Sequence, residues 1–206
     1  MRFDDYVRGR SVALTPVDRF AGFEVNVWLP AGWERVGTVT GMQVWCPRDG
    51  RSTGVFCANA VLTMHHVAAA LDAAEVFAML VDEQLHSVPG CREKHRAIAP
   101  AQDGVGVEGF LALHIPTHEF GALDSVTHSR IITDGQQTLI AQLTLTALHS
   151  APVQHAVVRL AVQPGASPAG VHIMMGDAYP DEPTPAAEPG ESVQRPLPTP
   201  QRVDDR

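Results

Sequence analysis

The chain has 206 residues, a formal net charge of -8 and an apolar share of 45%. This acidic balance argues against a nucleic-acid partner, because no basic stripe is present to offset the phosphates. No apolar run approaches the ~20 residues that a membrane-spanning helix needs, so we expect no integral membrane segment. The length allows one domain with a substantial core.

The N-terminal sequence, MRFDDYVRGR, has neither the apolar segment nor the small-residue cleavage site of a secretory signal. As written, the sequence therefore predicts a cytoplasmic protein. Non-classical export, or an upstream start that adds a signal peptide, are the alternatives. Three cysteines, Cys46, Cys57 and Cys91, lack C-x-x-C spacing and are expected to be small buried residues, with a single disulfide left open.

The first half of the chain predicts strands followed by one helix. Residues 1–20 are mixed in character, and we expect a loosely structured lead-in. Alternating apolar and polar residues predict strands at about 22–29, 42–46 and 55–67, with breaks at Pro30 to Gly32 and after Pro47. Asp72 and Glu75 form a capping-box pattern, which predicts a helix ending at Pro89–Gly90.

The second half predicts four more strands, at about 92–98, 107–115, 123–132 and 138–148. The segment 123–132 is polar, so we expect it near a sheet edge. Asp134–Gly135 predicts a tight hairpin turn before the last of these strands. Apolar residues from Val153 to Ala161 recur at helical spacing behind Ser150, which predicts a final helix packed on the sheet.

The composition changes from Pro164 onward, where nine of the 16 prolines lie. Such a segment buries too little apolar area to offset the entropy of ordering, so residues 164–206 are expected to form a disordered Pro/Ala/Glu-rich tail. We thus predict three parts: a lead-in (1–20), one α+β domain (21–163) and the tail. Because strands and helices do not alternate strictly, the domain should have a mainly antiparallel β-sheet with packed helices.

Several segments carry a family resemblance. LPAGWERV, at Leu29–Val36, resembles the P-x-G-W turn of the LpqN/LpqT lipoprotein family of mycobacteria. The segments that follow are similar in order: FCANAVLTMHHV, SVPGCRE, GVGVEGFLALHIPT and LIAQLTLTAL. The resemblance covers about residues 20–163, and it implies a PsbP-like α/β sandwich.

The resemblance also implies a class of function. Members of this family are envelope or secreted proteins without established enzymatic chemistry, linked to protein interaction and cell-envelope lipid transport. The family supplies no catalytic motif, so no catalytic residue is transferred. This sequence has no signal peptide and no lipobox cysteine, so a lipid anchor is not carried over.

Trp28, Trp33 and Trp45 are the candidate binding residues, because a large aromatic side chain outside the core marks a binding surface. The alternative is that each packs under a helix or loop. We name no catalytic residue, no metal ligand and no cofactor.

Histidine chemistry supplies the competing hypothesis. His114 and His118 share a face of an extended segment, with Glu119 beside them, but no H-E-x-x-H or C-x-x-C motif frames them. Structural histidines are the alternative interpretation.

Taken together, the sequence predicts a non-enzymatic interaction or ligand-binding module. A groove between sheet and helix would take an apolar ligand or a peptide from an unknown protein partner. A small α+β enzyme using acid–base or metal chemistry at His114, His118 and Glu119 is the alternative. A chaperone-like partner of another protein is a third possibility.

Overall fold

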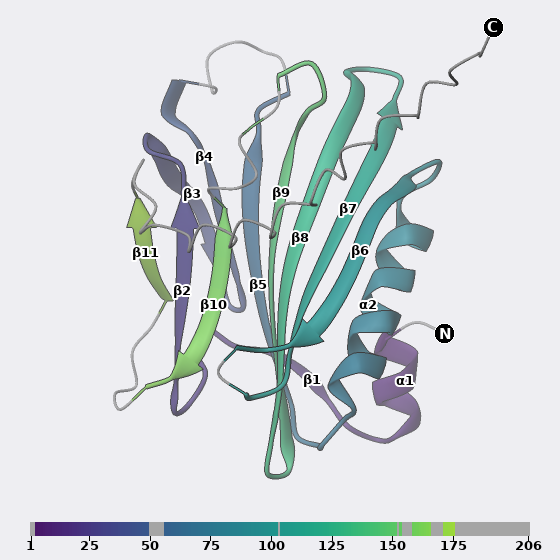
Figure 1. Ribbon diagram of the computed structural model, residues 1–206, viewed down its shortest axis with the longest axis vertical. Helices are drawn as coiled ribbons and strands as arrows, with labels where there is room; N and C mark the ends of the chain where they lie inside the picture. The colour runs from purple at the N-terminus through teal and green to yellow at the C-terminus, as the bar shows by residue number, and fades with distance from the viewer. Residues whose placement is uncertain are drawn as a thin grey trace, which may run out of the picture.

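The computed structural model describes residues 3–49, 56–102, 104–151, 153, 158–165 and 171–175. These residues form two helices and eleven strands (Figure 1). In chain order they are α1 (Phe3–Gly9), β1 (Leu14–Pro16), β2 (Phe23–Leu29), β3 (Trp33–Val39), β4 (Met42–Pro47), β5 (Asn59–Val67), α2 (Ala73–Ser87), β6 (Arg92–Pro100), β7 (Val107–Thr117), β8 (Gly121–Asp134), β9 (Gln137–Leu148), β10 (Arg159–Pro164) and β11 (Val171–Met175).

The main layer is an antiparallel sheet in the order β3-β4-β5-β9-β8-β7-β6, and β1 adds to the end of β5. The hairpin between β8 and β9 closes at Gly135, which has a positive φ of 59° and follows Asp134. A positive φ is accessible to glycine without a steric cost, so the turn predicted at Asp134–Gly135 is confirmed. The mainly antiparallel α+β architecture is confirmed as well.

A second sheet, in the order β10-β2-β11, packs on one face of the main sheet at its β3–β5 end (Figure 1). The apolar residues of β2 point into the space between the two sheets, where they meet Trp45, Leu62 and Leu143. These side chains are almost fully buried, and they form the larger of the two cores.

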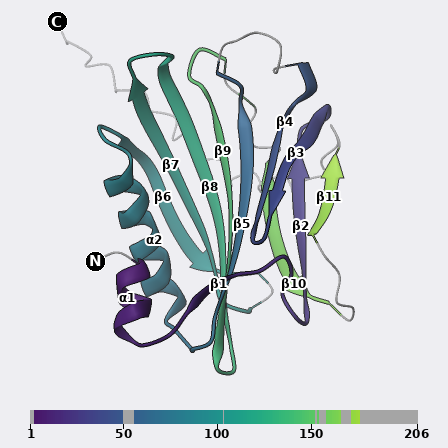
Figure 2. The same cartoon turned by 180° about the vertical axis from the view of Figure 1, so that it is seen from behind.

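Both helices pack on the opposite face of the main sheet, at its other end (Figure 2). The main contacts of α2 with the sheet are to β6, β7 and β8, and α1 packs against α2. The Asp72 side chain accepts a hydrogen bond of 2.8 Å from the Glu75 backbone N–H, which satisfies a free donor at the helix start. The predicted helix and its cap are therefore confirmed. Neither described helix is both long and apolar enough to cross a membrane.

Three local predictions are wrong. The lead-in is structured, since residues 3–9 are helical and β1 pairs with β5. The final helix is replaced at residues 159–164 by β10, and Val171–Met175, which falls in the predicted tail, is β11. Both strands pair with β2, one along each of its edges. The backbone groups of these edges need hydrogen-bond partners, and a local sequence pattern does not reveal which segments supply them. Residues 176–206 of the predicted tail lie outside the described residues.

The prediction that 123–132 lies near an edge is also wrong, because β8 is between β9 and β7. Its polar residues are tolerated there because they are hydrogen-bonded. Arg130, for example, is buried and donates to the backbone carbonyls of Val105 and Val107. Thr127 is buried as well and bonds to Thr144 at 3.0 Å.

Candidate functional site

The small sheet and the helices cover opposite faces at opposite ends of the main sheet. Each face of the main sheet therefore has a covered half and a less covered half. On the helix side, the less covered half consists of residues from β3, β4, β5 and β9. We call this surface the open face, and its residues, paired across the strands, are Val39, Met42, Val44, Val61, Thr63, Gln142, Thr144 and Thr146.

A line of hydroxyl groups runs along one side of the open face. Thr127 Oγ1 lies 3.0 Å from Thr144 Oγ1, and Ser125 Oγ lies 3.4 Å from Thr146 Oγ1. Thr127 also donates to Gln84 Oε1 of α2, at 3.3 Å. We call these four side chains the hydroxyl ladder. Thr144 and Thr146 are half-buried, so part of each residue is exposed on this face.

An apolar stripe lies beside the hydroxyl ladder. Val61 is the cross-strand partner of both Thr144 and Val44, which places the three side chains in one row. Val39 ends β3 and pairs with Met42, which begins β4. Their side chains are 57% and 38% exposed. The open face therefore presents hydroxyl groups and aliphatic groups side by side.

On the other face of the sheet, three polar side chains converge at the ends of adjacent strands. His114 Nδ1 of β7 lies 3.1 Å from Asp124 Oδ1 of β8. His149, which follows β9, places its Nδ1 2.7 Å from Asp124 Oδ2. The two imidazole rings are edge-to-face, with centroids 5.3 Å apart. One carboxylate is thus shared by two histidines, and we call these residues the His–Asp–His cluster.

The ionisation of Asp124 follows from these contacts. Partial burial of the carboxyl raises its pKa, but the hydrogen bonds and positive charges of His149 and His114 outweigh this effect and hold the pKa below its usual value. Asp124 is therefore a carboxylate at neutral pH.

The three tryptophans do not form one surface. Trp33 and Trp45 are buried in the core between the sheets, in agreement with the packing alternative. Trp28 is half-buried on the outer face of the small sheet, between its cross-strand partners Arg159 and Met174. Of the predicted binding residues, Trp28 alone is partly exposed.

The predicted histidine site is only partly assembled. His118 and Glu119 lie exposed in the turn after β7. Among the described residues, the three-residue group with metal-ligand spacing contains His114 but neither of these two. The two residues that join His114, Asp124 and His149, were missed because their approach depends on the pairing of β7, β8 and β9. The clue available in the sequence is the alternation of each strand, which fixes the face but not the register.

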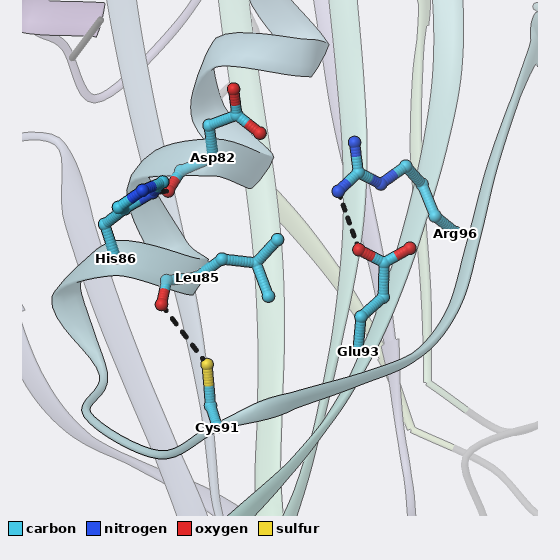
Figure 3. Close-up of polar contacts among 6 residues, drawn as sticks. All are labelled: Asp82, Leu85, His86, Cys91, Glu93 and Arg96. Atoms are coloured by element: carbon cyan, nitrogen blue, oxygen red, sulfur yellow. Dashed lines mark hydrogen bonds and ion pairs between the residues drawn. The ribbon is translucent and has the colours of Figure 1, made fainter.

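Cys91 and Cys57 each contact a backbone carbonyl. Cys91 lies beyond the C-terminus of α2, where its thiol donates to the Leu85 carbonyl at 3.4 Å, while His86 Nδ1 bonds to the Asp82 carbonyl at 2.6 Å (Figure 3). Cys57 contacts the Ala58 carbonyl. All three cysteines are half-buried instead of fully buried as predicted, and no disulfide joins them.

Comparison with known proteins identifies the fold but no sequence family. No protein-family profile matches the chain, and no curated protein is detectably similar in sequence. The solved structure of LpqN, involved in cell envelope biogenesis of Mycobacterium tuberculosis, matches with a TM-score of 0.65 at 15% identity, over 80% of this chain and 98% of LpqN. The Ran-binding protein Mog1p of Saccharomyces cerevisiae matches with a TM-score of 0.37 at 10% identity, over 66% of this chain and 78% of Mog1p. The chain therefore has an LpqN-like fold, as the sequence resemblance predicts.

Proposed function

We propose that the protein is a non-enzymatic binding module whose open face binds an amphiphile, a molecule with an alkyl chain and a hydroxylated headgroup. The observation that carries the proposal is the position of the hydroxyl ladder beside the apolar stripe, on a half-face of the sheet bordered by α2. Hydroxyl groups exchange hydrogen bonds with a polyhydroxylated headgroup, and the aliphatic side chains cover an alkyl chain.

The fold supports this choice of ligand. LpqN, which shares the fold, is involved in cell envelope biogenesis, a process rich in amphiphilic molecules. The proposal also retains the sequence-based prediction of an apolar ligand, but it places that ligand on the open face instead of at the tryptophans.

The test uses dodecyl maltoside below its critical micelle concentration, with maltose and dodecyl phosphocholine as comparison ligands. A ligand at tenfold its Kd stabilises the folded state by about 1.4 kcal/mol, which raises the Tm by about 3–5 °C for a chain of this size. We expect that rise with dodecyl maltoside, no rise with maltose, and a smaller rise with dodecyl phosphocholine. Equal rises with the two detergents would overturn the role of the hydroxyl ladder.

Two matched variants locate the binding surface. Met42→Glu places a charge on the apolar stripe, and Met174→Glu places the same charge beside Trp28 on the small sheet. The wild-type methionines are 38% and 45% exposed, so both glutamates remain hydrated. We expect Met42→Glu to abolish the ligand-induced Tm rise and Met174→Glu to preserve it. The reverse result would overturn the proposal and move the binding surface to Trp28.

A further inference from the structure

We propose that His114, Asp124 and His149 form a binding site for a first-row divalent metal ion of the zinc class. The side chains come from β7, β8 and the residue that follows β9 by one position. This site is on the face of the main sheet opposite the open face, so the proposal does not depend on the proposed ligand.

The backbone already brings the three residues together. Asp124 is the cross-strand partner of His114 in β7 and of Ala147 in β9. His149 lies two residues beyond Ala147, and its backbone N–H donates to the Ala122 carbonyl at 2.8 Å. Because side chains two residues apart share a face, the register of three neighbouring strands places the three donors on one face.

The spacing of the donor atoms suits one ion. With one donor atom taken from each residue, the three donor atoms all lie within 4.8 Å of one another. Ligand bonds to Zn²⁺ of about 2.0–2.2 Å in tetrahedral geometry place donor atoms roughly 3.3–3.6 Å apart. His114 Nδ1 and His149 Nδ1 lie 3.1 and 2.7 Å from the Asp124 oxygens. Side-chain rotations that widen these two contacts would seat an ion between the three residues.

The chemistry of the donors selects the class of ion. Two imidazoles and one carboxylate form a ligand set that Zn²⁺ and other first-row divalent ions accept, whereas Mg²⁺ prefers oxygen ligands. Asp124 offers a carboxylate oxygen to this ligand set. The side chain of His149 is 61% exposed, which leaves the remaining coordination positions to water.

Arg92, across from His114 on β6, adds a positive charge to this region of the sheet. Three protein ligands and a cationic neighbour should bind Zn²⁺ more weakly than a closed four-ligand structural site does. We therefore expect reversible binding instead of a metal that is required for folding.

The experiment is calorimetric titration of Zn²⁺ and Mg²⁺ into tag-free, chelator-treated full-length protein. We expect one Zn²⁺ to bind per chain, with a matching rise in Tm, and no binding of Mg²⁺. His149→Ala and Asp124→Asn should each weaken the Zn²⁺ affinity by at least tenfold, since even residues behind a metal ligand contribute 10–100-fold. His118→Ala, four residues beyond His114, is the matched control and should bind as the wild type does.

His149→Cys separates loss of a ligand from loss of structure. A thiolate is also a zinc ligand, so this variant should retain most of the affinity that His149→Ala loses. Unchanged Zn²⁺ affinity in both His149→Ala and Asp124→Asn would overturn the site. An equal loss in His118→Ala would overturn it too, because the binding would then belong to exposed histidines in general.

Discussion

Gly109 of β7 faces α2, and the ring of Phe77 lies directly over it. A Cβ atom at this position would overlap the ring, and Phe77 is buried with little room to move. Because Gly109 has no side chain, α2 can approach the sheet closely enough for the Phe77 ring to lie on β7. The sequence places Gly109 in the alternation of this strand, but it does not reveal the ring that fills the gap.

We predict that Gly109→Ala lowers the free energy of unfolding by about 1–3 kcal/mol, the usual cost of an overpacked core. Urea unfolding followed by circular dichroism measures the change. Gly37→Ala in β3 is the matched control, because its Cβ would meet Val44 at 3.9 Å, an ordinary contact. We expect this variant to be as stable as the wild type or slightly more stable. Equal losses in the two variants would show that the close approach of Phe77 has no special role.

At the scale of elements, α1 is held to α2 by its buried side chains and by one polar contact. Phe3, Tyr6 and Val7 are buried, and the Tyr6 hydroxyl donates to Glu75 Oε2 at 3.0 Å. Burial and then the hydrogen bond to Glu75 raise the pKa of Tyr6 above 10.0. The phenol must therefore stay protonated for this contact to persist.

This pKa shift predicts how stability depends on alkaline pH. Because the folded-state pKa exceeds the unfolded value, the contribution of Tyr6 is fully present below pH 10 and is lost as the pH rises through the folded-state pKa. Tyr6→Phe should cost about 1 kcal/mol at neutral pH, and the cost should shrink above pH 10. Tm measured against pH for both proteins provides the test. A difference in Tm that stays constant with pH would contradict the role of the hydroxyl group.

The elements differ in how far the sequence reveals them. The amphipathic helix α2 and strand β9 are predictable because their residue spacing matches one period and local signals mark their starts. Val158, Leu160 and Val162 of the β10 region also alternate, yet Val153 to Ala161 fits a helical spacing equally well. The free edge of β2 decides between the two structures, and that edge belongs to a segment far away in the chain.

At the scale of the whole molecule, one strand joins two cores. Leu143 of β9 points into the core between the sheets, whereas Ile140 points into the core under the helices. All three tryptophans of the chain lie on the small-sheet side, and both described helices lie on the other side. Tryptophan fluorescence therefore reports on the core between the sheets. The helical part of the circular dichroism signal reports on the core under the helices.

We predict a single cooperative unfolding transition, because loss of β9 removes both cores together. Tryptophan fluorescence and far-ultraviolet circular dichroism should give the same urea midpoint. Leu143→Ala and Ile140→Ala, at about 2–5 kcal/mol each, should shift both signals equally. A variant that moved the fluorescence midpoint alone would show two independently unfolding units.

The candidate sites depend on how the strands pair across the whole sheet. The individual helices and strands depend on this pairing less. His114 stands out in the sequence, but Asp124 and His149 join it through the register of three strands. The hydroxyl ladder likewise needs Thr127 and Thr144 to be opposite each other. A one-residue slip in register would turn each side chain to the other face, so residue type and spacing alone do not define these sites.

The small sheet has a consequence for how the protein is made. Its central strand, β2, pairs on one edge with residues 159–164 and on the other with residues 171–175. During translation β2 leaves the ribosome early, while both of its partners leave late. The backbone hydrogen-bonding groups on both edges of β2 thus remain without their strand partners while most of the domain is synthesised. Unpaired strand edges are prone to aggregation, so the nascent chain is most exposed to misassembly until residue 175 has emerged.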